Sequence, residues 1–411
     1  MKPPQSPWQR TLVVLFIVQL LTAAGFSSIF PFLPFYVEDL GSSSGLSVEV
    51  LSGLVFSLQG VSMMIASPIW GSLADRYGRK VMIQRATIAG ALTIAAMGLV
   101  QTAEQLIFVR ILQGALTGVV SANSALLASV TPRERSGYAM GMLQVALGTG
   151  LAVGPVAGGV LADAFGYRPA FYVTAALLTI GALLVTFLVH EDFIPDAAKA
   201  GARAVARGWR LVLGRSGVLV TYLMRFMSRA GRMMIIPIAP FFIATLVSDS
   251  SLMNTYVGWA ISLPALATTL SAGYFGRLGD RIGHRKVLVA CMLAAGLLFL
   301  PQGQVNSVWQ LLVLLALSGV AMGGVVPTIS ALLAHYTLPG EECATYGLDN
   351  SISAAGNAVA PAVGGLLAGL FGHPAAFTGT GLLLLAAAGI AAASLPHTAA
   401  HAVEPVAVIG D

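Results

Sequence analysis

The chain has 411 residues, of which 56% are hydrophobic and only 9% are Asp, Glu, Lys or Arg. Soluble globular domains carry about 25% charged residues, so the composition excludes that class and predicts a multi-pass membrane protein. The formal net charge of +5 does not indicate a nucleic-acid partner, because the basic residues gather in loops on one side of the predicted helices.

Twelve segments of the sequence are long and apolar enough to cross a bilayer, for which a helix needs about 20 residues. They are 11–37, 50–73, 79–101, 103–128, 137–162, 168–190, 216–246, 253–278, 285–304, 307–333, 343–370 and 373–395. No small-residue cleavage site follows the first segment, so we interpret it as a membrane helix and not as a signal peptide. The predicted domains are a six-helix bundle at 1–190, a linker at 191–215, a second six-helix bundle at 216–395 and a tail at 396–411.

The loops on the two sides of the predicted helices differ in charge. Twelve spans place both termini on one side, which also holds Arg10, the linker arginines and the basic loops near Lys80 and Arg285. The opposite loops hold a single basic residue, Arg168. Basic loops stay in the cytoplasm, so we expect an all-α integral membrane protein with both termini cytoplasmic.

The second half of the sequence repeats the first. Four residues of the loop at 71–80 recur 205 positions later: Gly71, Asp75, Arg76 and Gly78 match Gly276, Asp280, Arg281 and Gly283. Three residues of the fifth segment recur 206 positions later: Pro155, Gly158 and Gly159 match Pro361, Gly364 and Gly365. Duplicated motifs at a nearly constant offset predict two bundles side by side, with a substrate cavity between them.

Three motifs of the first bundle resemble family signatures. The loop at 71–80 reads GSLADRYGRK, the fourth segment contains RILQG from Arg110, and the fifth contains GLAVGPVAGG from Gly150. Together they resemble the drug:proton antiporter branch of the major facilitator superfamily, over about residues 8–395. The resemblance implies a secondary exporter in the bacterial inner membrane. Such a protein moves small amphipathic compounds or drugs outwards by alternating access, in exchange for protons.

The resemblance implies that the loop at 71–80 is a conformational latch, which holds the outward-facing state. Asp75 would bind the N-terminal end of the eleventh helix near Glu341, where free N–H groups favour a carboxylate. The simpler alternative is a basic turn that only sets the topology. The expected latch residues are Gly71, Asp75, Arg76, Gly78, Arg79, Asp280 and Arg281.

Small residues recur along the fifth predicted helix. Gly150, Gly154 and Gly158 are spaced by four, which places them on one face and predicts close helix packing. Pro155 would add a local bend, and Gly159 completes the motif. We expect this helix to pack at the joint between the bundles, and the resemblance implies that the motif belongs to an antiporter.

An arginine inside a membrane helix costs about 2.5–3.5 kcal/mol, so such residues usually face a cavity or a partner. Arg110, with Gln113 one turn away, is expected in the proton-coupling site, as the resemblance supports; the alternative is that it reaches back to the external surface. Carboxylates able to carry the proton are scarce. Asp349, just inside the eleventh helix, and Glu38, at the external end of the first, are the candidates.

Arg225, Arg229 and Arg232 lie at i, i+4 and i+7 of the seventh predicted helix, within an arc of about 60°. Three such charges would cost roughly 8–10 kcal/mol in lipid, so we expect them to line water. They predict an electropositive wall for an anionic group such as a carboxylate or phosphonate. The alternative is a helix that begins later and leaves Arg225 at the cytoplasmic surface.

Amides inside membrane helices also seek polar partners, and we expect several to face the cavity. With the three arginines, the expected substrate-binding residues are Gln19, Gln59, Asn123, Gln144, Arg225, Arg229, Arg232, Asn350 and Asn357.

The sequence has no P-loop, nucleophile elbow, zinc pattern or cofactor fingerprint, so we expect no enzyme, no cofactor and no metal. The expected partners are a small-molecule substrate, protons and the lipid bilayer, with no nucleic acid and a monomeric chain. One alternative is a dedicated exporter of a single anionic metabolite, such as a siderophore. Another is a non-transporting receptor or a lipid scramblase on the same fold.

Overall fold

The structure, a computed structural model, describes residues 7–132, 135–191, 217–247, 250–337 and 342–395. All regular elements within these ranges are helices, which confirms the predicted all-α class. The first half of the chain forms α1 (Pro7–Ser28), α2 (Leu33–Leu40), α3 (Val48–Tyr77), α4 (Arg79–Met97), α5 (Ala103–Leu116), α6 (Val119–Val130), α7 (Ser136–Phe165) and α8 (Tyr167–Leu188). The second half forms α10 (Val218–Ile235), α11 (Ala239–Leu246), α12 (Met253–Ile282), α13 (His284–Phe299), α14 (Val308–Met322), α15 (Val325–Tyr336), α16 (Glu342–Phe371) and α17 (Pro374–Ser394).

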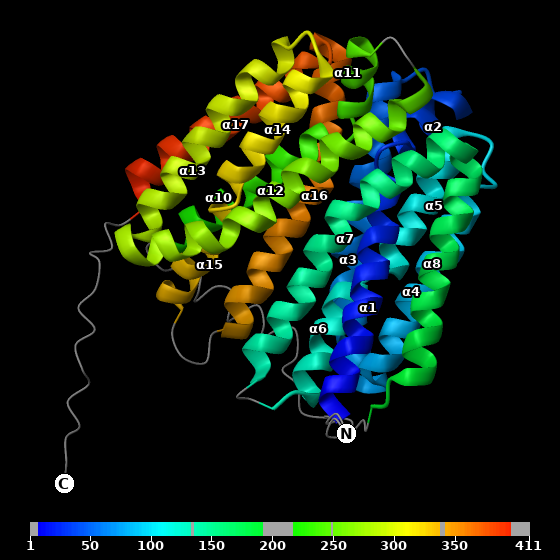
Figure 1. Cartoon of the computed structure of the whole chain (residues 1–411), viewed down its shortest axis with the longest axis vertical. Helices are drawn as coiled ribbons and strands as arrows, with labels where there is room; N and C mark the ends of the chain where they lie inside the picture. The colour runs from blue at the N-terminus through cyan, green and yellow to red at the C-terminus, as the bar shows by residue number, and fades with distance from the viewer. Residues whose placement is uncertain (1–6, 133–134, 192–216, 248–249, 338–341, 396–411) are drawn as a thin grey trace.

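The helices stand in two groups that meet at one end of the molecule and separate at the other (Figure 1). The end that carries α2 and α11 is called the upper end here, as in the figure, and the end at which α1 begins is the lower end. Helices α1 to α8 form the first half and α10 to α17 the second. The two halves touch mainly where α3 crosses α16 and where α7 crosses α12.

Two of the predicted membrane helices are broken at proline. The segment 11–37 divides between α1 and α2, and the segment 216–246 divides between α10 and α11. Pro31 and Pro237 lie in these breaks, 206 positions apart. Proline has no N–H to donate and its ring displaces the preceding turn, so the helix cannot continue straight through it. The repeat therefore extends to the irregular parts of the fold.

Glycines mark equivalent turns in the two halves. Gly78 and Gly283 have φ values of +95° and +98°, and Gly166 and Gly372 have values of +83° and +84°. This left-handed region is open to glycine at little cost because it has no Cβ. The repeated loop thus makes the same tight reversal between α3 and α4 as between α12 and α13.

Each half packs a separate apolar core. The second half has a large cluster of buried side chains that includes Tyr222, Met292 and Phe377. The first half has two clusters, one around Phe171 and one around Leu15. The buried residues of each of these clusters all come from one half of the chain. One half can therefore move against the other while both cores stay packed.

Eight stretches among the described residues are long and apolar enough to cross a membrane, and nine if α10 and α11 count as one span bent by 45°. The predicted segments 79–101, 103–128 and 253–278 are largely helical but do not meet the same test. The structure is therefore an all-helical membrane fold, while the number of twelve spans stays a prediction. The predicted linker lies outside the described residues apart from Glu191, and so does the predicted tail.

Candidate functional site

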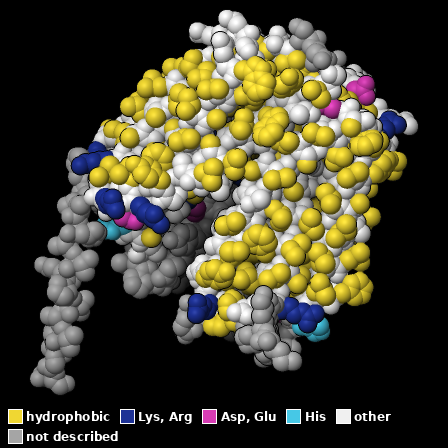
Figure 2. All heavy atoms as spheres, viewed as in Figure 1, with side chains coloured by type: hydrophobic (Ala, Val, Ile, Leu, Met, Phe, Trp, Pro, Cys, Tyr) yellow, Lys and Arg dark blue, Asp and Glu magenta, His cyan; other side chains and the backbone are white. Residues whose placement is uncertain are grey.

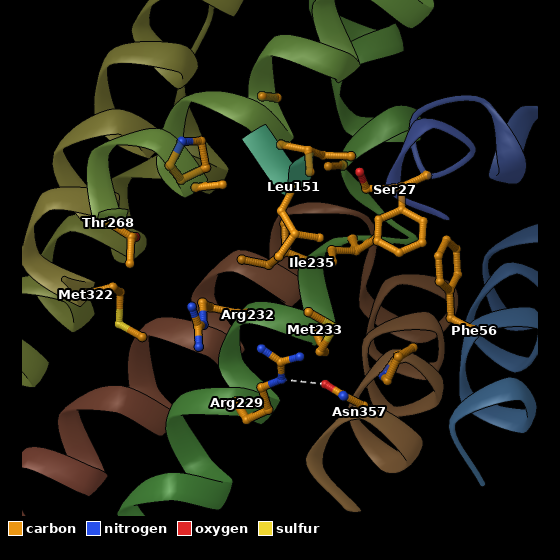
Figure 3. Close-up of a pocket in the computed structure, with 18 of the residues that line it drawn as sticks. Ser27, Phe56, Leu151, Arg229, Arg232, Met233, Ile235, Thr268, Met322 and Asn357 are labelled. Carbon is orange, nitrogen blue, oxygen red and sulfur yellow. Dashed lines mark hydrogen bonds between the residues drawn. The ribbon is translucent and has the colours of Figure 1, made fainter. Parts of the chain in front are cut away.

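A cavity of about 360 Å³ lies between the two halves and is lined by residues of both. Its wall is mostly apolar, with Phe30, Phe56 and Leu151 from the first half and Met233, Leu315 and Met322 from the second (Figure 3). Pockets for small molecules have volumes of about 300–1,000 Å³ and walls of this kind, with a few polar groups that orient the ligand. The cavity therefore fits one compact, largely apolar molecule.

Two arginines supply the charge in this cavity. Arg229 and Arg232 both reach into it from α10 (Figure 3). Arg229 donates from Nε to Oδ1 of Asn357 on α16 at 2.6 Å. The Nε of Arg232 is buried and has no hydrogen-bond partner within the described part of the chain. None of the described lining residues is acidic, so no carboxylate in the wall balances these two charges.

The third arginine of the predicted row is neutralised elsewhere. Arg225 donates from Nε to Oδ1 of Asp349 at 2.7 Å and from an Nη atom to Ser330 Oγ at 3.0 Å. Both members of this pair are largely shielded from solvent, with side chains 9% and 13% exposed. Neither residue lines the cavity. The structure thus divides the row into an ion pair nearer the lower end and two arginines in the cavity wall that have no carboxylate beside them in the described lining.

The first half carries two polar pairs of its own. Asn123 donates to the Gln19 side-chain oxygen at 2.8 Å, and both residues are buried away from the cavity lining. Arg110 is 1% exposed and donates to Gln113 Oε1 at 2.6 Å, while its guanidinium lies 5.2 Å from the Phe56 ring centroid. Because Phe56 lines the cavity, Arg110 lies one side chain behind the wall.

The other predicted binding residues lie in different surroundings. Gln59 and Asn357 line the cavity. Gln144 and Asn350 are exposed and do not line the cavity. Glu38, a candidate for proton coupling, is exposed near the end of α2.

At the upper end the two halves are joined by a carboxylate that sequence reasoning missed. Asp163, near the end of α7, accepts hydrogen bonds from the backbone N–H groups of Asn254 and Thr255 at 3.1 and 2.8 Å. It also accepts one from each of their side chains, at 2.8 and 2.6 Å. A carboxylate at the start of a helix binds free N–H groups and the positive end of the helix dipole. A second link joins Glu49 on α3 to His373, 3.1 Å away, just before α17.

Glycines let the backbones of the two halves approach closely from the upper end down to the cavity. A Cβ added at Gly258 would lie 2.5 Å from the Pro155 carbonyl oxygen, and one at Gly60 would lie 2.9 Å from the Cα of Ala358. A Cβ at Gly159 would overlap the Asn254 carbonyl. Pro155 and Gly159 therefore contribute to the joint between the halves.

The glycine ridge on α7 has a different neighbour from the one expected. Added Cβ atoms at Gly150, Gly154 and Gly158 would meet α1, which belongs to the same half. These three glycines pack the first half together, and the contact with the other half is made by Pro155 and Gly159 on the adjoining face.

The lower end is open. Added Cβ atoms at Gly137 and Gly141 on α7, Gly273 on α12 and Gly347 on α16 would meet no atom of the described residues within 4 Å. These helices are the ones that touch near the upper end, so they diverge along their length. Figure 2 shows the molecule hollowed between the halves towards the lower end. The cavity is thus closed above and reached from below.

The predicted latch loop has one partner that the sequence did not suggest. The backbone N–H groups of Arg79 and Lys80 donate to the two carboxylate oxygens of Glu191 at 3.0 and 2.7 Å. Glu191 therefore caps the start of α4. Arg76 is exposed and lies 5.4 Å from the Tyr77 ring centroid.

The remaining latch residues are only partly described. The Asp280 carboxylate lies 3.4 Å from His284, and Arg281 is exposed. The side chain of Asp75 and the surroundings of Gly71 lie outside the described residues, as does Glu341. The predicted contact between Asp75 and the start of the eleventh helix stays a prediction.

Comparison with known proteins places the chain among membrane transporters. The family model described as Major Facilitator Superfamily matches residues 15–225 and 221–409. The multidrug resistance protein MdtG of Salmonella dublin is 36% identical over 392 residues, which cover 94% of this chain and 96% of that protein. The protein of the same name from Salmonella typhimurium has the same identity and coverage.

Solved structures of low sequence identity share the fold. The human organic anion transporter MFSD10 superposes with a TM-score of 0.68 at 21% identity, covering 94% of this chain and all of that one. A bacterial homologue of the human lysosomal transporter Spinster, in an inward-facing and occupied conformation, gives a TM-score of 0.78 at 14% identity, covering 95% of this chain and 98% of that one. At these identities the likeness concerns the fold alone.

Proposed function

Because the chain belongs to the Major Facilitator Superfamily, we propose that it is a secondary exporter of small amphipathic compounds, drugs among them, that works by alternating access and proton antiport. Membership of a family of transporters also means that the chain is a transporter and not an enzyme. The cavity between the halves, closed at one end and open at the other, carries the proposal in the structure. The multidrug resistance relatives support drugs as substrates.

We propose twelve spans with both termini in the cytoplasm of a bacterium, whose inner membrane holds the protein. Four pairs of helices would each make one broken span: α1 with α2, α5 with α6, α10 with α11, and α14 with α15. The Lys and Arg side chains visible in Figure 2 gather mainly towards the lower end. This charge pattern supports a cytoplasmic lower end under the positive-inside rule. The proposed domains are 1–190 and 216–395, joined by the linker 191–215.

The proposed cycle starts from the conformation described here, in which the cavity opens towards the cytoplasm. Substrate enters from below, the lower ends close and the upper ends separate. In the second conformation Asp75 and the basic residues of the two repeated loops would hold the lower ends together. The upper links at Asp163 and Glu49 must break at the same step, because a rocking transporter needs contacts that form in one state only.

Asp349 is proposed as the proton carrier. It is a carboxylate shielded within α16, and its side chain lies 2.7 Å from the Arg225 guanidinium. Ionised Asp349 paired with Arg225 fits a state that has just released its proton to the cytoplasm. A proton arriving from outside would neutralise Asp349 and free Arg225 from the pair. Arg110 with Gln113 behind the wall, and Glu38 near the upper end, are proposed as accessory groups on the proton route.

Proton flux in proteoliposomes tests this function. The vesicles carry an interior pH dye and an imposed pH gradient, and cationic, neutral and anionic amphipathic compounds are added in turn. We expect several unrelated compounds to evoke proton movement in the wild type and none in Asp349→Asn. Glu104→Gln serves as the matched control, since Glu104 is a surface carboxylate bonded to Ser42 within its own half. Absence of compound-evoked flux from the wild type would overturn the proposed antiport.

A dedicated exporter of one anionic metabolite is the second candidate. The observation that favours it is the pair of uncompensated arginines in the cavity wall. The two candidates differ in competition: unrelated drugs should compete for one site in a multidrug exporter and should leave a dedicated exporter unaffected.

A further inference from the structure

We propose that Arg229 and Arg232 form an anion subsite within the cavity, which takes the carboxylate of an amphipathic acid while the apolar wall takes its hydrocarbon body. This inference rests on the proposed function, because it specifies what the exporter's cavity recognises.

The charges around the cavity point to an anionic ligand. Every arginine near it has a distinct role: Arg225 is paired with Asp349, and Arg110 is held by Gln113 behind the wall. Among the described residues, Arg229 and Arg232 alone present a guanidinium to the cavity, and the described lining has no carboxylate to balance them. Two like charges three residues apart on one helix repel each other in a low-dielectric wall. A ligand carboxylate between the two guanidinium groups would supply the missing counter-charge and so offset their repulsion.

The hydrogen-bond donors of the two arginines are also unequally satisfied. The side-chain oxygen of Asn357 accepts a hydrogen bond from Arg229 Nε and so fixes the position of that guanidinium. Arg232 Nε is buried and has no described partner. A buried donor without a partner costs free energy, and an arginine is suited to binding a carboxylate through two parallel N–H bonds. Arg232 is therefore assigned as the main anion ligand, with Arg229 as the second.

The rest of the wall determines what accompanies the charge. The side chains of Phe56, Leu315 and Met322 offer apolar surface in the same cavity as the arginines, and methionine adapts its shape to different ligands. A volume of about 360 Å³ admits one or two fused rings with a short acidic group. The ligand class that fits is a monovalent aromatic or aliphatic acid, and its neutral analogue should fill the same space without the ionic contact.

The test compares 2-naphthoate with its uncharged isostere 2-naphthamide. Binding of each to the full-length protein is measured by titration calorimetry in nanodiscs of phosphatidylcholine, which carries no net charge. We expect naphthoate to bind the wild type about 10- to 100-fold more tightly than naphthamide, as for a charge-assisted hydrogen bond in a shielded site. Arg232→Gln should remove most of this preference, Arg229→Gln a smaller part, and Arg232→Lys should retain part of it.

A matched control comes from outside the cavity. Arg85 is a half-buried arginine on α4 that stacks on Trp70, with 3.3 Å between its guanidinium carbon and the ring centroid. Arg85→Gln removes a similar charge and should leave the preference for naphthoate unchanged. Unchanged thermal unfolding and unchanged naphthamide binding in Arg232→Gln would show that the cavity is intact.

The outcomes separate this inference from the proposed function. Equal binding of the two naphthalenes to the wild type, or a preference that survives in the Arg229→Gln/Arg232→Gln double variant, would overturn the subsite and leave the exporter standing. An arginine-dependent preference without compound-evoked proton flux would support the subsite and contradict the antiporter. An arginine-dependent preference together with compound-evoked proton flux would support both the anion subsite and the proposed antiport.

Discussion

Arg225 donates to Asp349 at 2.7 Å, and it occupies the position in the second half that Gln19 occupies in the first. The two sites carry different chemistry on the same scaffold. Gln19 bonds to Asn123 on α6, whereas Arg225 bonds to Asp349 on α16 and to Ser330 on α15. The first site is held by an uncharged amide pair and the second by an ion pair. The charged pair therefore distinguishes the second half of the repeat from the first, and it is the group to which the proposed proton coupling is assigned.

Loss of the Asp349 charge should destabilise the protein by roughly 1–3 kcal/mol, because Arg225 would stay shielded without its counter-charge. The change is Asp349→Asn, and the measurement is thermal unfolding of the detergent-solubilised protein. The double variant Arg225→Gln/Asp349→Asn should recover most of the loss, since it removes both charges. A single variant as stable as the wild type would show that the pair contributes nothing to folding.

Asp163→Asn should shift the molecule towards the conformation that is open at the upper end. The amide carries no charge to offer the N–H groups of Asn254 and Thr255, and a charge-assisted bond of about 1.5–3 kcal/mol changes a two-state population 10-fold or more. Distances between spin labels at Leu46→Cys and Leu252→Cys, which replace exposed residues of the two halves, measure the shift.

The matched control for this shift is Glu104→Gln. The Glu104 carboxylate accepts hydrogen bonds from Ser42 and Ser43 of its own half, so it should not influence how the halves meet. Equal distance distributions for Asp163→Asn and the wild type would exclude Asp163 as a gate residue.

Gly258→Ala should hinder closure of the upper end. Its methyl group would lie against the Pro155 carbonyl, and overpacking of this kind costs about 1–3 kcal/mol. The initial rate of transport in proteoliposomes should fall about 5- to 100-fold. Gly389→Ala, at an exposed position of α17 where an added Cβ would meet no atom of the described residues within 4 Å, should transport at the wild-type rate. If both variants behave alike, the close crossing of α7 and α12 is not needed for the cycle.

Glu191→Gln should weaken the first turn of α4 by about 0.5–2 kcal/mol, because the carboxylate there binds two free N–H groups at once. Thermal unfolding measures the loss. Asp280→Asn is the control, since that carboxylate is 72% exposed and should contribute little to stability. A melting temperature that falls equally in both variants would argue against a specific cap.

Features that repeat along the chain could be predicted from sequence. The similar φ values at Gly78 and Gly283 follow from the duplicated loop, and the breaks at Pro31 and Pro237 follow from proline chemistry. The apolar runs likewise predicted the all-α class. These features depend on neighbours in the sequence, which the sequence shows directly.

Contacts between helices were harder to predict. Asp163 meets partners 91 and 92 positions away, and Glu191 meets partners 111 and 112 positions away. Helical spacing shows which residues share a face, but it does not show which helix crosses that face or at what height. For the same reason the spacing of the arginine row could not separate Arg225 from Arg229 and Arg232. That division arises because Asp349 on α16 lies opposite only the first of them.

The close backbone crossings at Gly60 and Gly258 have a consequence for the response of the protein to ionic strength. Van der Waals attraction between closely packed atoms does not depend on dissolved salt, whereas attraction between exposed charges weakens as salt rises. The lower ends would close through exposed groups such as Arg76, Asp280 and Arg281. On the proposed orientation, with the lower end in the cytoplasm, a concentrated cytoplasm, as in a cell losing water, should therefore favour the conformation whose cavity faces inwards.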